Sequence, residues 1–437
     1  MLASGLLITI ETTRPGENAV QTAIAGDRFY DHDNLADPFA MMAEMRASTP
    51  VARTIDPAGR EIFVVTDLAL IEQVAKRTDD FSNAFGHLLM AGNMHSEVVE
   101  ILMREPLEAT LLLTTDDPEH NRYRALVNAA FATGRIAHLT PVIETLVDQL
   151  IDSFIERGTC DFVDEFAVLL PTYVIADILG LPRGMYDKVK IWSDAIIGIV
   201  GRTGDKASEI EAAKLIVEQR RYLRATVEAR RSAPGDDLLS GLVGAHLDGV
   251  APLTDAEATA LAVETSVAGN ETTRNTLMSG LVQLIRHPDQ LQALIDDPGL
   301  MANAVEEILR YETPASSMWR IAHRDAELGG VAIPAGATLL LRYDGGNRDP
   351  QRFEQPNNFD IRRRNARAHI AFGAPSVHRC LGQMLARKEL VIGFNRLLKR
   401  LKNLRIVEGS RTDYQPSLMF HTIGSLQLTF DPAQRLS

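Results

Sequence analysis

The stretch FGAPSVHRCLG, residues 372–382, places one of the chain's two cysteines, Cys380, in a short loop rich in Gly and Pro. The apolar pattern after it predicts a helix from about residue 381 to 402. The first N–H groups of that helix and the positive end of its dipole would stabilise a thiolate. Gly382 leaves room for a flat group near the backbone. By itself, this segment fits a thiolate ligand and a buried core cysteine about equally well.

The composition is that of a globular protein: 437 residues, 45% hydrophobic, enough for one large core. A net charge of -13 argues against nucleic acid as the main partner. Two cysteines without a spacing pattern, Cys160 and Cys380, predict a reducing compartment. The apolar run at residues 6–10 is far shorter than the ~20 residues of a membrane helix, and no signal-peptide pattern surrounds it. We therefore expect a cytoplasmic protein without a membrane anchor, and a loosely ordered segment at residues 1–27.

Helical periodicity dominates residues 38–293. The β-rich runs at 51–55 and 61–66 predict a hairpin, the runs at 327–333 and 338–343 predict a second hairpin, and residues 404–407 and 425–430 predict the last strands. No internal repeat or low-complexity linker divides the chain. We expect residues 28–437 to form a single domain, mainly α, with a small β-rich lobe near 51–66, 327–343 and 404–430.

A long central helix is predicted from Thr254 to about His287, with the sequence VAGNETT at residues 267–273 in its middle. Gly269 costs roughly 1 kcal/mol relative to Ala in a helix. A helix opened there would free a carbonyl for the Thr272 hydroxyl and leave a groove for a small ligand or water. Glu271 beside Thr272 suits the relay of protons to a bound oxygen species. The alternative is a patch of small residues where another helix crosses.

Five motifs follow in a fixed order: AGNET at 268–272, Glu307-x-x-Arg310, NRDP at 347–350, FD at 359–360, and the Cys380 loop. Alone, Glu307 and Arg310 would be an ordinary ion pair one helical turn apart. In this order the motifs resemble the cytochrome P-450 family of haem-thiolate monooxygenases in its soluble bacterial form. The pattern HxxxR at 120–124 resembles the haem-propionate helix of that family, so the resemblance covers nearly the whole chain.

The resemblance implies a cytochrome P-450-like fold with heme b between the central helix and the Cys380 loop. Cys380 would be the axial thiolate ligand of the iron, which favours O–O cleavage. The implied residues around the haem are Phe372, Ala268 and Gly382, with the basic residues His120, Arg124, Arg320 and His378 facing the propionates. Buried carboxylates need such partners. Glu307 and Arg310 would pair with Arg363 and support the loop.

The Cys380 loop departs from the family pattern at one point. Phe372 and Cys380 are eight residues apart instead of seven, and Pro375 stands where the family has a second glycine. Proline still allows a tight turn. Because His378, Cys380 and Gly382 keep the family spacing, we expect a reshaped loop that retains the ligand.

A stripe on the central helix should face the iron, because Glu264, Ala268 and Thr272 follow at four-residue spacing. Glu264 would lie roughly 12 Å from Thr272, where it could orient a substrate hydroxyl or amine; a carboxylate that reaches water is the alternative. The other expected pocket stretches, 85–113, 192–200, 314–318 and 419–423, imply an apolar guest. The candidate substrate contacts are Glu264, Val267, Ala268, Phe85, Ser316 and Met419.

Electrons must come from a separate partner, because the chain contains no nucleotide-binding or flavin motif. A basic patch near the Cys380 loop predicts an acidic ferredoxin as that partner. The patch comprises Arg379, Arg387, Lys388, Lys399, Arg400 and Lys402. For the segment 399–402 a solvated helix face is an equally good interpretation.

Together these features predict a monooxygenase that activates O2 opposite Cys380 and hydroxylates an apolar small molecule, with Glu271 and Thr272 delivering protons. The run AGNETTRN at 268–275 resembles members that act on steroids, terpenoids or alkyl chains. Two alternatives remain. One is a peroxide-driven oxygenase of the same fold, although such members lack the acid–alcohol pair. The other is a non-catalytic haem-binding carrier or sensor, supported only by the reshaped loop.

Overall fold

The computed structural model describes residues 26–57, 59–90, 94–131, 133–201 and 205–436. The segment expected to be loosely ordered, residues 1–27, lies outside the described residues up to residue 25, and the first helix begins at Gly26. Within the described ranges, no helix is long and apolar enough to cross a membrane.

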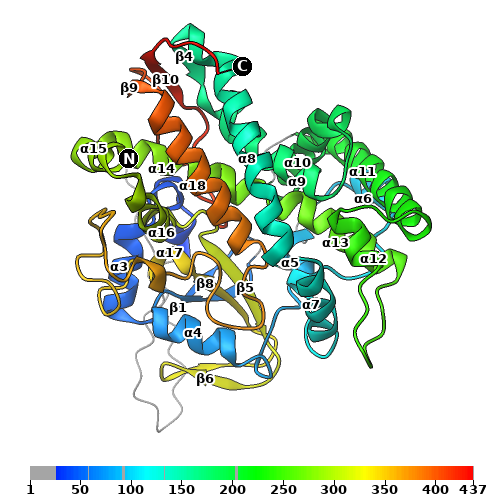
Figure 1. The fold of residues 1–437 in the computed structure, drawn as a ribbon. Helices are drawn as coiled ribbons and strands as arrows, with labels where there is room; N and C mark the ends of the chain where they lie inside the picture. The colour runs from blue at the N-terminus through cyan, green and yellow to red at the C-terminus, as the bar shows by residue number, and fades with distance from the viewer. Residues whose placement is uncertain (1–25, 58, 91–93, 132, 202–204, 437) are drawn as a thin grey trace.

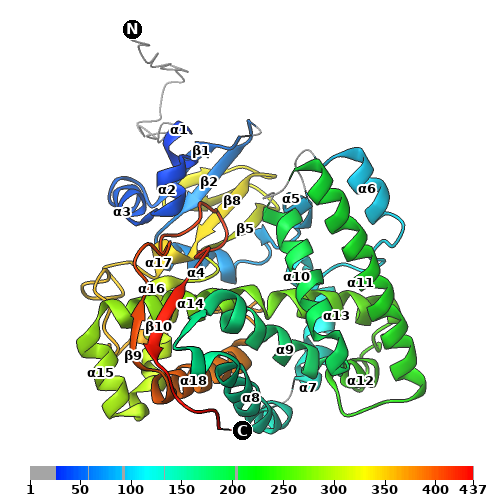
Figure 2. The same ribbon diagram turned by 90° about the horizontal axis from the view of Figure 1, so that it is seen from above.

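Helices make up most of the described chain, as the periodicity predicted. Figure 2 shows α13 (Asp255–Ala268) and α14 (Glu271–Arg286) end to end across the middle of the molecule. The other α-helices are α1 (Gly26–Phe29), α2 (His32–Ala36), α3 (Phe39–Ser48), α4 (Leu68–Lys76), α5 (Gly86–Met90), α6 (Ser96–Leu102), α7 (Glu119–Ala130), α8 (Thr133–Phe154), α9 (Leu169–Ile178), α10 (Tyr186–Gly201), α11 (Lys206–Ser232), α12 (Leu238–Val243), α15 (Pro288–Asp296), α16 (Met301–Glu312), α17 (Tyr343–Gly346) and α18 (Gln383–Arg400).

Short helices of other types connect these elements. The 3-10 helices are η1 (Leu112–Thr114), η2 (Ile155–Arg157), η4 (Arg183–Met185), η5 (Pro298–Leu300) and η6 (Ala366–Ala368), and η3 (Val163–Ala167) is a π-helix. The helix after the Cys380 loop, expected from about 381 to 402, is α18. It packs along α8, and Figure 1 shows the two helices beside each other.

The strands form three small sheets, β1-β2-β8-β5-β3, β4-β10-β9 and β6-β7. Their bounds are β1 (Val51–Ile55), β2 (Glu61–Val65), β3 (Phe81–Ser82), β4 (Thr159–Asp161), β5 (Ser317–Ala322), β6 (Ala326–Leu328), β7 (Val331–Ile333), β8 (Thr338–Arg342), β9 (Lys402–Ile406) and β10 (Gln427–Asp431). The first sheet lies at the opposite side of the molecule from α11 and α12 (Figures 1 and 2). The architecture is therefore mainly α with a small β-rich part, as predicted.

The first predicted hairpin is confirmed, because β1 and β2 are antiparallel with Val51 opposite Val65. The second predicted hairpin is wrong. β7 pairs with β6, while β8 runs parallel to β2 and antiparallel to β5. Gly329 and Gly330 have φ of 57° and 80°, which allows a tight two-residue turn between β6 and β7. That turn forms the hairpin earlier in the chain and leaves β8 free to fill the middle of the five-stranded sheet.

The central helix is interrupted, whereas the sequence predicted one helix from 254 to 287. α13 ends at Ala268 and α14 begins at Glu271. A Cβ atom on Gly269 would lie 2.4 Å from the Cδ1 of Ile175, so α9 approaches the backbone where only glycine fits. The Asn270 side-chain amide donates to the Ser266 carbonyl at 2.8 Å and so satisfies an acceptor of the last turn of α13.

Candidate functional site

Cys380 ends a folded loop immediately before α18. Its backbone N–H donates to the Phe372 carbonyl at 2.9 Å, and Gly373 turns the chain with φ of 84°, a conformation that favours glycine. The extra residue is accommodated outwards, because Pro375 and Val377 are exposed. The reshaped loop therefore still brings its cysteine to the start of the helix.

The sulfur of Cys380 is accessible, yet the surrounding protein removes enough water for burial to raise its thiol pKa. Backbone N–H groups of Gly382 and Gln383 and the positive charge of Arg124 act in the opposite direction and favour the thiolate. Cys160 differs. It is 3% exposed on β4, where burial raises its thiol pKa to about 12. Only Cys380 is placed to act as a ligand, because Cys160 is a core residue.

Four basic residues converge beside Cys380. The rings of His120 and His378 have centroids 3.8 Å apart. Arg124 donates from Nη2 to the Arg379 carbonyl in the Cys380 loop at 2.6 Å. Burial, followed by the positive charges of His120, Arg320 and Arg124, lowers the pKa of His378 to about 3. The helix α7, the strand β5 and the Cys380 loop therefore bring these side chains to one place.

The two arginines of this cluster lack carboxylate partners in the part of the chain that the structure describes. Among the described residues, no carboxylate lies within 4.0 Å of the Arg124 or Arg320 guanidinium, although Arg320 is 3% exposed. Both ring nitrogens of His120 are buried without a hydrogen-bond partner; the Asp117 carboxylate, 3.7 Å from Nδ1, is too distant. A Cβ on Gly382 would meet nothing within 4 Å. Because buried cations need anionic partners, these residues fit a flat group with carboxylates, such as haem.

The break in the central helix lies among the residues predicted for catalysis. Thr272 is half-buried, and its hydroxyl donates to the Ala268 carbonyl at 3.4 Å, as expected for a locally opened helix. Ala268 is exposed although it belongs to the central helix. This combination gives the helix an accessible notch with one hydroxyl at its edge.

The Glu271 carboxylate is buried and held by three side chains. Its Oε1 accepts from Asn275 Nδ2 at 3.1 Å and from Thr422 Oγ1 at 3.3 Å, and its Oε2 lies 3.2 Å from Arg274 Nη1. These partners were not predicted from the sequence. Asn275 stands four residues after Glu271 and could have been found from helical spacing, whereas Thr422 is 151 residues away.

The acidic residue of the Glu307-x-x-Arg310 motif binds two arginines, as expected. Arg310 Nε donates to Glu307 Oε2 at 2.7 Å and its Nη2 to Oε1 at 2.8 Å, while Arg363 Nε lies 3.1 Å from both oxygens. All three side chains are less than a tenth exposed. Arg310 and Arg363 also donate to backbone carbonyls of residues 354–358, so the triad fixes that segment.

A neighbouring cluster, missed by the sequence analysis, lies behind Phe372. Glu306 accepts from His369 Nε2 at 3.0 Å and from Arg387 Nε at 2.7 Å. Although burial opposes it, these hydrogen bonds and the Arg387 charge lower the pKa of Glu306 to about 2. The Arg387 guanidinium lies 4.4 Å from the Phe372 ring centroid. In the sequence, only the position of Glu306 next to Glu307 indicated this cluster.

The basic patch predicted beside the Cys380 loop is weaker than its sequence indicates. Arg387 is paired with Glu306, and Arg400 is paired with Asp148 and Asp152. Lys388 donates to Thr140 Oγ1 at 2.6 Å. Two of the six predicted cations are therefore neutralised by carboxylates of other helices, which charge counting along α18 does not reveal.

The candidate substrate contacts differ in exposure. Phe85 and Ser316 are fully buried, and the Ser316 hydroxyl donates to the Leu418 carbonyl at 3.0 Å. Val267 and Met419 are partly exposed. Glu264 accepts from the backbone N–H of Leu112 at 2.7 Å and of Leu113 at 2.9 Å. Its carboxylate is thus bound to backbone, which the sequence did not predict.

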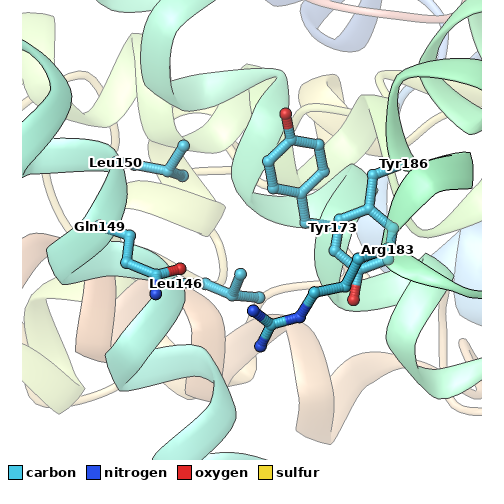
Figure 3. A pocket seen from close by; sticks show the side chains of 6 residues that line it. All are labelled: Leu146, Gln149, Leu150, Tyr173, Arg183 and Tyr186. Carbon is cyan, nitrogen blue, oxygen red and sulfur yellow. The ribbon is translucent and has the colours of Figure 1, made fainter.

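Figure 3 shows a separate pocket of about 170 Å³. Its lining comes from α8, α9, η4 and α10 and comprises Leu146, Gln149, Leu150, Tyr173, Arg183 and Tyr186. The Tyr186 hydroxyl donates to the Asp177 carboxylate at 3.0 Å, so its polar end is already engaged. None of these residues belongs to the site around Cys380.

Comparison with known proteins gives a consistent result. The family model for cytochrome P-450 matches residues 175–425. A steroid C26-monooxygenase of Mycobacterium tuberculosis is 37% identical over 327 residues, covering 75% of this chain and 87% of the relative. The cytochrome P-450 monooxygenase PikC of Streptomyces venezuelae is 33% identical over 406 residues, covering 91% and 92%. The solved structure of cytochrome P-450 CYP109Q5 from Chondromyces apiculatus matches with a TM-score of 0.82 and 31% identity, covering 93% of this chain and 98% of that one.

Proposed function

This chain belongs to the cytochrome P-450 family of monooxygenases, and we propose that it hydroxylates an apolar small molecule of the steroid class with electrons from a separate ferredoxin. The similarity to a steroid C26-monooxygenase supports that substrate class. The observation that carries the proposal is the cluster of basic residues beside Cys380. Two of its members, Arg124 and Arg320, have no carboxylate partner among the described residues. Heme b would supply the missing carboxylates.

In this proposal the Cys380 thiolate would hold the iron of heme b. His120, Arg124, Arg320 and His378 would bind its propionates, and Phe372, Ala268 and Gly382 would contact it. Haem with a thiolate ligand supplies the iron at which O2 is activated for insertion of one oxygen atom into a C–H bond. The triad of Glu307, Arg310 and Arg363 supports the segment that leads to the loop.

Glu271 and Thr272 serve as the proton relay. The Thr272 hydroxyl at the helix notch would pass a proton to the reaction site, and the neighbouring Glu271 carboxylate would resupply that proton to the hydroxyl. The bonds from Asn275 and Thr422 keep Glu271 in one rotamer. We therefore assign these two residues to positioning the acid.

The substrate contacts in this proposal are Val267, Ala268 and Met419, which are at least partly exposed, and Glu264, together with the buried Phe85 and Ser316. The ferredoxin docks near Arg379, Lys388 and the exposed Met384 and Val377, because ion pairs already occupy Arg387 and Arg400.

The decisive experiment expresses the protein with haem and screens steroids, terpenoids and fatty acids for a shift of the haem absorption. Compounds that shift it are then incubated with NADH, a ferredoxin and its reductase. We expect NADH consumption together with a hydroxylated product, measured by mass spectrometry. Product formed only with hydrogen peroxide would identify a peroxide-driven oxygenase, and binding without product would identify a carrier or sensor.

The ligand assignment is tested on the reduced carbon monoxide complex. Cys380→Ser should abolish the thiolate type of absorption, whereas Cys160→Ser, a change in the core far from the loop, should keep it. A thiolate spectrum retained in Cys380→Ser would refute the assignment.

A further inference from the structure

Glu264 belongs to α13, but its carboxylate is engaged with a segment 152 residues earlier in the chain. The segment is η1 and its two flanking residues, 111–115, which lead into α7. Oε2 of Glu264 accepts from the Leu112 N–H at 2.7 Å and Oε1 accepts from the Leu113 N–H at 2.9 Å. One side chain thus binds two successive backbone donors.

These two N–H groups depend on Glu264. They belong to the first residues of a 3-10 helix, whose initial donors have no partner within the helix. Among the described residues, the other bonds of the segment to the rest of the protein are sparse: Asn83 Nδ2 donates to the Leu113 carbonyl at 3.2 Å. A bond to an ionised carboxylate is stronger than this neutral one. Glu264 is therefore the main polar tie between the segment and the central helix.

The segment also occupies a functional position. It directly precedes α7, which carries His120 and Arg124 of the basic cluster. Glu264 lies one helical turn before Ala268, the exposed residue at the notch of the central helix. Residues 111–115 are therefore joined by the chain to the helix of the basic cluster and by Glu264 to the central helix one turn before the notch.

We propose that Glu264 is a positioning residue that clamps residues 111–115 to the central helix and thereby controls access of substrate to the proposed haem site beside Ala268; this rests on the function proposed above. The clamp needs the ionised carboxylate. A protonated carboxyl uses one oxygen as a donor, so one of the two N–H groups loses its acceptor. Protonation therefore weakens the clamp.

The clamp is expected to respond to pH near neutrality. Burial raises the pKa of Glu264 to about 7, against the effect of the two backbone hydrogen bonds. No charged side chain among the described residues, on α13 or on the elements packed against it, contributes to that shift. The ionised clamp should thus prevail at pH 8 and the released form at pH 6.

Hydrogen exchange of the haem-bound protein tests the clamp directly. In the wild type, the Leu112 and Leu113 amides should exchange several-fold and up to about tenfold faster at pH 6 than at pH 8 after correction for intrinsic rates, because a pKa of about 7 makes the released form about tenfold more populated at pH 6. Glu264→Gln keeps the shape but not the charge, and should show the fast exchange at both pH values. Glu408→Gln, which removes an exposed acid after β9, should behave like the wild type.

Access is measured by the association of butyl isocyanide, an uncharged apolar ligand, with the reduced haem. Association at pH 8 should be several-fold faster in Glu264→Gln than in the wild type. Equal exchange in the two proteins at pH 8, or a pH response that survives in Glu264→Gln, would overturn the clamp. If the variant does not fold, the pH response of the wild type still decides. Failure of isocyanide binding in every protein would refute the proposed haem function, while hydrogen exchange would still test the clamp.

Discussion

Replacing Glu389 by Gln should change how the stability of the protein depends on pH. Glu389 lies on α18 with a side chain that is 1% exposed, and its Oε2 has no hydrogen-bond partner among the described residues. Burial alone raises the pKa of this carboxyl from 4.5 to about 8. The folded protein therefore keeps a proton on Glu389 that the unfolded chain releases at much lower pH.

The sign follows from proton linkage. Between pH 4.5 and about 8 the folded state binds more protons than the unfolded state, so this group lowers the free energy of unfolding as pH rises. From pH 5 to pH 9 the loss amounts to about 4 kcal/mol, because each pKa unit corresponds to about 1.4 kcal/mol. The neutral amide of Gln does not titrate. The free energy of unfolding of the variant relative to the wild type should therefore increase by about 4 kcal/mol from pH 5 to pH 9. This change does not depend on the stability difference between the two proteins at pH 5.

Thermal unfolding provides the assay. An unfolding entropy of roughly 2.1 cal/mol/K per residue gives about 0.9 kcal/mol/K for this chain, so the gain corresponds to about 4 °C. The difference in Tm between Glu389→Gln and the wild type should thus grow by about 4 °C between pH 5 and pH 9. Glu408→Gln, a change at an exposed acid, controls for general charge effects. A Tm difference that stays constant within about 1 °C across this range would refute the reasoning.

Three further predictions concern contacts inside the fold. Glu307→Gln leaves two buried guanidiniums without a carboxylate and should cost about 3–5 kcal/mol, measured by urea unfolding together with haem content. Gly280→Ala places a Cβ 2.8 Å from side chains of α16 and α18 and should cost about 1–3 kcal/mol in thermal melts, whereas Gly184→Ala, where a Cβ meets nothing, should be nearly neutral. Thr422→Val removes one bond to Glu271 and should raise the ratio of NADH consumed to product formed several-fold; Thr422→Ser should restore it.

Features with a local cause could be predicted from the sequence. The β1–β2 hairpin follows from two β-rich runs around a Gly turn, and the weak point of the central helix follows from Gly269 beside Thr272. The second hairpin was mispredicted because two turns compete within residues 326–343. The hairpin turn forms at Gly329-Gly330, because both residues adopt positive φ. β8 pairs instead with β2 and β5, between which it lies in the five-stranded sheet.

Features with a remote cause could not be predicted. Thr422 bonds to Glu271 although it lies 151 residues away in the chain, so the sequence around Glu271 does not reveal the surroundings of its carboxylate. Glu306 neutralises Arg387, so the sequence of α18 alone does not give the charge of the predicted basic patch. Glu264 shows the same limit. Helical spacing placed it on a predicted stripe with Ala268 and Thr272, but its partners are backbone groups of a segment that carries no motif.

The uncompensated positive charge of the basic cluster is stronger evidence for a bound haem than the order of the sequence motifs. α7, β5 and the Cys380 loop each bring basic groups to one point, and burial lowers the pKa of both Arg124 and His378, so the folded protein disfavours their charged forms. Mutual repulsion adds to that cost. Independent elements of a stable fold would not converge in this way unless an anion offset the cost. Since the same point holds an accessible cysteine, the anion must belong to a group that a thiolate also binds, and an iron porphyrin with two carboxylates meets both conditions.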